Sequence, residues 1–484
     1  MIFIAIGRLT QFALLLLTLR AATEFLTPIE MGKVSIVTAT VALFSLLFIN
    51  PVGMFMNRRM HAWEANGLIA EYYAYFWRYL CLVSIFAGLI LAVLNWLDIW
   101  RSSVEIYLLI FLVCGNLIFA TLNQLVIPSL NMFGFRGWFA LLNVATVAVS
   151  LIVAVFLVHA IRPVAEYWLG GLLIGQMCIG LVGKQVLYKK LNHVKIEKGE
   201  REKLTQSNVC ALVMYGWPVA IAVGLGWFQS QGYRYWMESQ LGLAELGLFV
   251  AGFGISAGLI SGLESILSTF LQPKFYKSLE KNNTSSNSEA WVEYAQTIVP
   301  SLLLTTIFIT ATASELTRMF LGESFVQSTQ FVIWGAVAEL GRVATAAFSM
   351  AAHARMNTKT LMLPNFVGAA GTLVLLLLLV PLYGSMGVVV AIVLASAASL
   401  IISAVLTKRY LGMTLSLTNF VKSAAMGGGL WVLAGALKQA INNKQSNGEA
   451  LVILCGVGIY FSVCQYYLLH PSLKDEVFFK KNSK

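Results

Sequence analysis

Seven ionisable side chains lie within or beside the long apolar stretches of this 484-residue chain. A charged side chain at the centre of a bilayer costs roughly 2.5–3.5 kcal/mol on translocon scales, so such residues usually face a polar cavity and have a function. The seven residues are Arg8, Arg20, Arg234, Glu264, Glu339, Arg342 and Lys422. Their chemistry suits two tasks, which are binding an anionic group and coupling to a cation.

The arginines are the candidates for binding an anion. Arg20 and Arg234 are each followed four residues later by a glutamate, Glu24 or Glu238. This spacing also allows a local ion pair on one helical face, and both interpretations stay open. Arg8 is a further candidate, with snorkelling to lipid headgroups as its structural alternative.

Glu264 is the sharpest candidate for ion coupling. It lies in the apolar stretch 243–270 among Ser256, Ser261 and Ser265, with no cation within one helical turn. A carboxyl group in that environment tends to be protonated, which suits proton or sodium coupling. A carboxylate bonded to serines or water is the structural alternative.

Glu339, Arg342 and Lys422 are the remaining ionisable residues of the apolar stretches. Glu339 and Arg342 share a helical face, so an ion pair there is as reasonable as a site. We assign Glu339 and Glu24, with Glu264, to the candidate coupling-ion residues, and Arg342 to the substrate-binding ones. Lys422 is expected to anchor its span at the headgroups.

Aromatic side chains cluster beside Arg234 and could stack on sugar rings. Trp227 and Tyr235 are the members that we assign to substrate binding. The alternative is a place in the belts of Trp and Tyr found at membrane surfaces.

The composition places these residues in a membrane protein. Hydrophobic residues make up 58% of the chain and charged residues 11%, against about 25% charged in soluble proteins. The net charge of +11 comes from short loops and forms no nucleic-acid-binding motif. We expect no nucleic-acid partner, no cofactor and no metal.

Apolar runs long enough to cross a bilayer predict an all-α protein with about fourteen transmembrane helices. They fall at 2–22, 34–56, 79–97, 104–130, 138–159, 166–188, 208–230, 243–270, 294–313, 329–352, 361–380, 388–407, 420–438 and 449–469. With both termini inside, cytoplasmic segments hold 21 lysines and arginines and outer loops seven, as the positive-inside rule requires.

An internal repeat divides the chain. Glu30-x-Gly32 follows Arg20 much as Glu245-x-Gly247 follows Arg234. Both copies begin at an odd-numbered span, which predicts parallel repeats. The predicted domains are an N-lobe at 1–190, a cytoplasmic linker at 191–207, a C-lobe at 208–410, and two additional helices with a cytoplasmic tail at 411–484.

Three stretches resemble a known family, the Wzx-type oligosaccharide-lipid flippases of the multidrug/oligosaccharidyl-lipid/polysaccharide exporter superfamily. They are the opening at 20–56, the segment 215–255, and the turn VPLYGSMG at 380–387. The family usually has Asp-Arg-Tyr in the second stretch, where this chain has Gly232-Tyr233-Arg234-Tyr235.

The resemblance implies two pseudo-symmetric six-helix lobes around a central cavity, with two additional C-terminal helices. It implies a flippase of the bacterial inner membrane, not an enzyme. Such a protein would move undecaprenyl-pyrophosphate-linked oligosaccharides outward by alternating access. The oligosaccharides would serve the synthesis of O-antigen (lipopolysaccharide), capsule or exopolysaccharide. Its partners would be this substrate, membrane lipids, and the polymerase and chain-length regulator of the pathway. The alternatives are a cation-coupled multidrug exporter and a polysaccharide polymerase or ligase.

Overall fold

The computed structural model describes most of the chain, namely residues 2–65, 69–98, 104–191, 206–279, 284–354, 362–411, 416–441 and 447–468. Most of the predicted cytoplasmic linker at 191–207 and the predicted C-terminal tail lie outside these residues.

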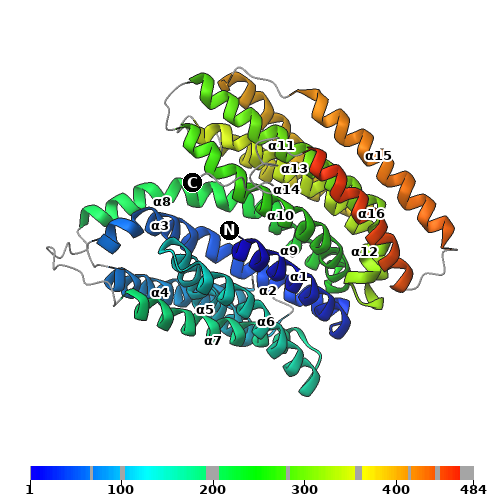
Figure 1. Ribbon diagram of the computed structural model, residues 1–484. Helices are drawn as coiled ribbons and strands as arrows, with labels where there is room; N and C mark the ends of the chain where they lie inside the picture. Colours follow the sequence, from blue (N-terminus) through cyan, green and yellow to red (C-terminus); the bar gives the residue numbers. More distant parts are fainter. Residues whose placement is uncertain are drawn as a thin grey trace. The chain divides into compact units, whose positions relative to one another are not determined.

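All regular structure among the described residues is helical, which confirms the predicted all-α class (Figure 1). The α-helices of the first half are α1 (Ile2–Phe25), α2 (Pro28–Phe44), α3 (Asn50–Ala65), α4 (Ile69–Trp96), α5 (Ile106–Met132), α6 (Arg136–Ala160), α7 (Ala165–Leu191), α8 (Gln206–Trp227) and α9 (Tyr233–Leu241). Those of the second half are α10 (Leu243–Leu279), α11 (Thr284–Ala311), α12 (Ala313–Phe320), α13 (Thr329–Ala354), α14 (Met362–Leu411), α15 (Leu417–Ala440) and α16 (Asn447–Leu468).

Eleven of these helical stretches, counted over the described residues, are long and apolar enough to cross a membrane. A helix satisfies its own backbone hydrogen bonds, so it can lie in a solvent that offers none. One stretch, within α14, contains two predicted spans, because Gly384 leaves helical geometry there with a φ of 56°. The predicted first and seventh spans are helices α1 and α8, outside the eleven. The protein is therefore a multi-pass membrane protein.

Two short segments have π-helical geometry. The segment η1 (Ser45–Ile49) joins α2 to α3, and η2 (Phe228–Gly232) joins α8 to α9. A π-helical turn inside an α-helix often marks a functional position. Arg234 and Tyr235 begin α9 directly after η2, so this irregular turn sets where their side chains point.

The chain forms two units, which are described separately below. Unit 1 comprises residues 1–238 and 242–247, and unit 2 comprises residues 239–241 and 248–484. Unit 1 thus includes α8 and most of α9 (residues 233–238) as well as α1 to α7. The lobe boundaries inferred from the repeat stay a prediction.

In unit 1, α2 and the start of α10 cross at the two repeat glycines, Gly32 and Gly247, with their backbones in close contact. A Cβ added to Gly32 would collide with the carbonyl of Leu243, and one added to Gly247 would collide with that of Pro28. Leu243 and Pro28 each lie four residues before the other glycine of the pair. The contact is therefore reciprocal, as a two-fold relation between the two copies requires.

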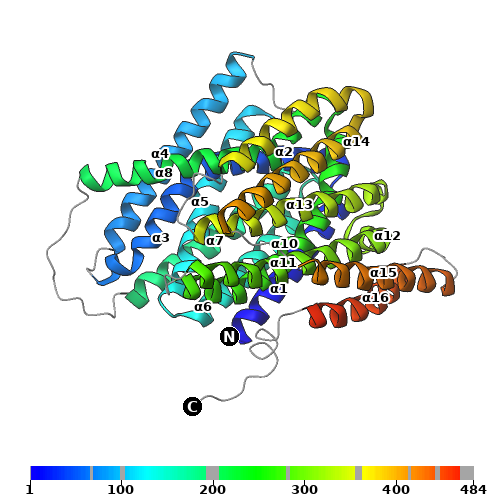
Figure 2. The same cartoon turned by 90° about the horizontal axis from the view of Figure 1, so that it is seen from above.

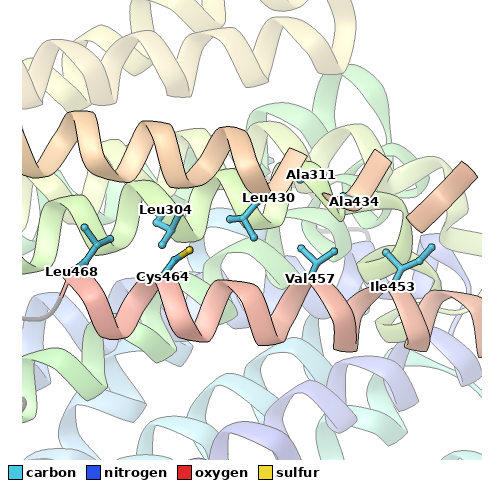
Figure 3. Close-up of a cluster of buried hydrophobic side chains, with 8 residues drawn as sticks. All are labelled: Leu304, Ala311, Leu430, Ala434, Ile453, Val457, Cys464 and Leu468. Carbon is cyan, nitrogen blue, oxygen red and sulfur yellow. The ribbon is translucent and has the colours of Figure 1, made fainter. Parts of the chain in front are cut away.

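In unit 2, α15 and α16 pack on α11, a neighbour far away in sequence (Figures 1 and 2). Figure 3 shows the buried side chains of these three helices that form one core, which are Leu304, Ala311, Leu430, Ala434, Ile453, Val457, Cys464 and Leu468. Polar contacts run beside this core. Gln465 Nε2 donates to the Ser301 carbonyl at 2.9 Å and Ser423 Oγ donates to the Pro300 carbonyl at 2.9 Å.

Pro300 explains why polar side chains are useful at this position. Proline has no N–H, so inside α11 it leaves the carbonyl of Gln296 without its usual helical donor. Asn419 of α15 donates to that carbonyl from 3.5 Å. An unsatisfied carbonyl is costly in lipid, so this contact favours the docking of α15 at this turn of α11.

Candidate functional site

In unit 1, three of the predicted substrate-binding residues converge on α2. Arg234 Nη1 donates to the Ser35 carbonyl at 3.1 Å. Trp227 Nε1 donates to the Ala39 carbonyl at 3.1 Å, and the hydroxyls of Tyr235 and Thr40 are hydrogen-bonded at 2.9 Å. The rings of Trp227 and Tyr235 lie 6.0 Å apart. The structure thus brings Arg234, Trp227 and Tyr235 together along six residues of one helix, 35–40.

The Arg234 guanidinium is only partly satisfied by α2. Its Nη1 also donates to Thr38 Oγ1 at 3.4 Å. Its Nε, like the hydroxyl of Ser35, is buried and has no hydrogen-bond partner among the described residues. Buried polar atoms of this kind usually bind water or a ligand. Arg234 therefore gives the site positive charge, and its Nε and the Ser35 hydroxyl are buried polar atoms without a partner among the described residues.

Arg20 and Arg8 each contact nearby side chains within unit 1. Arg20 lies 2.6 Å from Glu24, four residues along α1, with 28% and 51% of their side chains exposed. The local pairing considered from the sequence is therefore present, and it engages the predicted coupling residue Glu24. Arg8 is exposed, 5.5 Å from the centre of the Phe139 ring, and donates to Gln11. Roles for Arg20 and Arg8 in substrate binding stay predictions.

In unit 2, the predicted pair of Glu339 and Arg342 forms on α13. The two side chains approach to 2.8 Å, with Glu339 15% and Arg342 43% exposed. Arg342 also reaches α10, where its Nη2 donates to Ser261 Oγ at 3.3 Å. The ion pair is therefore part of a contact between α10 and α13.

Glu264 lies one helical turn beyond Ser261 on α10, and it is half-buried. Arg342 of α13, which is paired with Glu339, donates to Ser261. Glu264 thus has no cation within one turn of its own helix, as expected, and Arg342 contacts the neighbouring serine from another helix. Coupling through Glu264 or Glu339 stays a prediction.

Sequence reasoning missed some partners of these residues. Thr38 and Thr40 receive Arg234 and Tyr235, and the alternating polar residues of the segment SIVTAT were the available signal. Lys438, the last residue of the predicted span 420–438, pairs with Glu315 at 3.0 Å, and only 6% of the Glu315 side chain is exposed. Lys422 is exposed on α15, where it can reach headgroups. Within the described ranges, no cluster of three metal-binding side chains occurs.

Comparison with known proteins supports the fold. No family model and no curated protein matches the sequence. A lipid II flippase, MurJ in an inward closed conformation, superposes with a TM-score of 0.62 at 13% identity, covering 96% of this chain and 98% of that one. An inward-facing multidrug resistance MATE family transporter of the MOP superfamily superposes with a TM-score of 0.56 at 14% identity, covering 84% of this chain and 98% of that one.

The chain has the fold of these transporters. A MATE structure in complex with MaL6 agrees, with a TM-score of 0.52, 12% identity, and coverage of 85% of this chain and 94% of that one. The flippase thus matches about an eighth more of this chain than the two MATE structures do.

Proposed function

We propose that this protein is a flippase that moves undecaprenyl-pyrophosphate-linked oligosaccharide repeat units across the bacterial inner membrane by alternating access. The observation that carries the proposal is a likeness of fold to a lipid II flippase that covers nearly all of both chains. The match to the flippase also covers more of this chain than the match to the inward-facing MATE transporter, 96% against 84%.

Arg234 is the residue that we assign to the pyrophosphate. Its position after the η2 turn fixes the guanidinium against α2, while Nε keeps an unused donor. A guanidinium binds phosphate oxygens through two parallel N–H groups, so its geometry matters as well as its charge. Trp227 and Tyr235 are assigned to the sugar rings. In this proposal the residues bind and orient the substrate without catalysing a reaction.

The pathway gives the remaining assignments. Both termini would lie in the cytoplasm, where the lipid-linked unit is made, and a polymerase with its chain-length regulator would use the translocated unit. The product would be O-antigen, capsule or exopolysaccharide. These assignments rest on the family resemblance and on the Lys/Arg bias of the loops.

A cation-coupled multidrug exporter is the second candidate. The observation that favours it is the ion pair of Glu339 and Arg342, which lies one helical turn from Glu264 through the contact with Ser261, because carboxylates at this place could attract a cationic compound. An exporter of this kind would protect cells from cationic dyes, whereas a flippase would not. A polysaccharide polymerase or ligase has no comparable support among the described residues.

The experiment that tests the flippase is removal of the protein from its native cell, followed by mass spectrometry of lipid-linked intermediates. We expect oligosaccharides on undecaprenyl pyrophosphate to accumulate and surface polysaccharide to fall. Wild-type protein should reverse both effects. Arg234→Gln should reverse neither, and Arg234→Lys should act in part because it keeps the charge. Increased dye sensitivity without accumulated intermediates would instead identify the exporter.

A further inference from the structure

Unit 1 carries a group of cations that the transport proposal does not use. We call it the basic patch, and its members come from α4, the start of α6 and the end of α7. They are Arg78, Arg136, Lys184, Lys189 and Lys190. All are exposed except Lys184, which is half-buried. Over the part of the chain that the structure describes, none of the five forms an ion pair.

Aromatic rings hold three of these cations in place. Lys184 Nζ lies 5.2 Å from the centre of the Trp77 ring and 6.0 Å from that of Tyr188. Trp77 itself packs edge-on against Phe119 of α5, with 6.5 Å between ring centres. A cation within about 6 Å of a ring face is attracted by the ring's negative face. The contact joins α7 to α4 and fixes the ammonium group between them.

The other two ring contacts extend the patch. Lys190 Nζ lies 5.9 Å from the Phe135 ring, which places it beside the first residue of α6, Arg136. Arg78 lies 5.8 Å from the Tyr75 ring, on the same helix as Trp77. A ring satisfies one side of a cation and leaves N–H groups on the other side. The patch therefore presents positive charge and free donors that an anion can use.

The position of the basic patch favours a phospholipid over a soluble phosphate as the bound anion. Lys184 lies seven residues before the end of α7, or about 10 Å along the helix axis. The exposed apolar side chains of Leu181 and Leu82, from α7 and α4, are available to contact acyl chains. Trp and Tyr at the level of the headgroups are typical of membrane surfaces. A soluble phosphate would leave the apolar side chains unused, whereas a phospholipid would cover both.

We propose that the basic patch binds the headgroup phosphate of an anionic phospholipid of the surrounding bilayer. Lys184 and Lys190 contact the phosphate as point charges, the rings fix the lysines, and the acyl chains lie along α4 and α7. A cation near an anionic membrane surface contributes about fivefold in affinity. Removing two of these cations should therefore weaken lipid binding about 25-fold.

The test uses the full-length protein, stripped of lipid in a neutral detergent, to which dioleoyl phosphatidylglycerol is added. Native mass spectrometry counts the bound lipid molecules. We expect Lys184→Gln with Lys190→Gln to bind about 25-fold more weakly than wild type. Phosphatidylcholine should bind weakly to both proteins. Thermal unfolding in the same detergent shows whether the variant is folded.

The matched control is Lys408→Gln with Arg409→Gln at the end of α14. Both residues are exposed cations, and neither makes a ring contact among the described residues. This pair should leave phosphatidylglycerol binding within about twofold of wild type. An equal loss in both pairs would overturn the proposal, because it would mean that diffuse charge attracts the lipid. Wild-type binding by the Lys184 and Lys190 pair would also overturn it.

A second variant tests the rings without changing the charge. Trp77→Leu removes the ring beside Lys184 and should weaken phosphatidylglycerol binding severalfold, whereas Lys184→Arg should preserve most of it. Wild-type binding by a folded Trp77→Leu variant would refute the ring-built site. Full competition by millimolar inorganic phosphate would show that the patch binds a soluble anion, and it would refute the lipid.

Discussion

Replacement of Gly247 by alanine tests the glycine crossing of unit 1 most directly. The added Cβ would collide with the Pro28 carbonyl oxygen, and it would lie 2.7 Å from the Pro28 carbonyl carbon and 3.0 Å from the Gly32 nitrogen. Comfortable carbon contacts lie near 3.5–4.0 Å. All these neighbours are backbone atoms, so no side chain can rotate away. The start of α10 must therefore move away from α2.

The magnitude follows from overpacking. Forcing a methyl group into a packed contact costs roughly 1–3 kcal/mol. Alanine recovers about 1 kcal/mol of helix propensity relative to glycine, but that gain is the same at any helical glycine. Gly170 of α7 has no neighbour within 4 Å of an added Cβ, so Gly170→Ala is a matched control. We expect Gly247→Ala to be about 1–3 kcal/mol less stable than Gly170→Ala.

The assay is unfolding in mixed micelles by titration with sodium dodecyl sulfate, followed by tryptophan fluorescence. Because Gly32 and Gly247 share one crossing, separation of the helices by either substitution should make room for the other. The double alanine variant should therefore lose less stability than the sum of the two single variants. Equal stability of Gly247→Ala and Gly170→Ala, or strict additivity of the pair, would refute the reciprocal contact.

Two further predictions concern polar contacts between helices, and a third concerns ion coupling. Asn419→Leu should destabilise the protein by about 0.6–2 kcal/mol. The loss should be smaller in a Pro300→Ala background, because the Gln296 carbonyl of α11 regains its helical donor there. A double-mutant cycle of unfolding free energies measures the difference, and a zero coupling energy would contradict the explanation. Tyr235→Phe should cost about 1 kcal/mol by breaking the 2.9 Å bond to Thr40, and Thr40→Val should add little to it in the same assay. Glu264→Gln should stall or uncouple flipping in proteoliposomes under a proton or sodium gradient, with Glu264→Asp tolerated in part, and wild-type gradient dependence of the Gln variant would make Glu264 a structural carboxylate.

The helices and the local ion pairs were predictable because their signals are short-range. Twenty apolar residues in a row predict a span wherever the chain places it. The pairs Arg20 with Glu24 and Glu339 with Arg342 follow from spacings of four and three on a helix. Gly384 was also accessible, because the turn segment that contains it separates two predicted spans.

Contacts between helices that are far apart in the chain could not be predicted from the sequence. Arg234 bonds to a carbonyl 199 residues away, and Trp227 to one 188 residues away. In water, an apolar stripe indicates which face of a helix meets its neighbours. In lipid both faces are apolar, so the pattern does not distinguish neighbouring helices from acyl chains. Small and polar residues indicate where helices contact one another, but each of them has several possible partners in the sequence.

Lys438 shows how far such reasoning could have gone. Its position at the end of α15 suggested a loop cation, whereas the structure pairs it with Glu315 and with the Ala311 carbonyl at 3.1 Å. Glu315 follows the apolar stretch 294–313 almost directly and is nearly fully buried. A buried carboxylate requires a cation or several donors, so the need for a partner was visible in the sequence. The identity of that partner was not visible, because several lysines and arginines lie at the predicted outer ends of spans. Only the packing of α15 against α11 brings Lys438 within reach of Glu315.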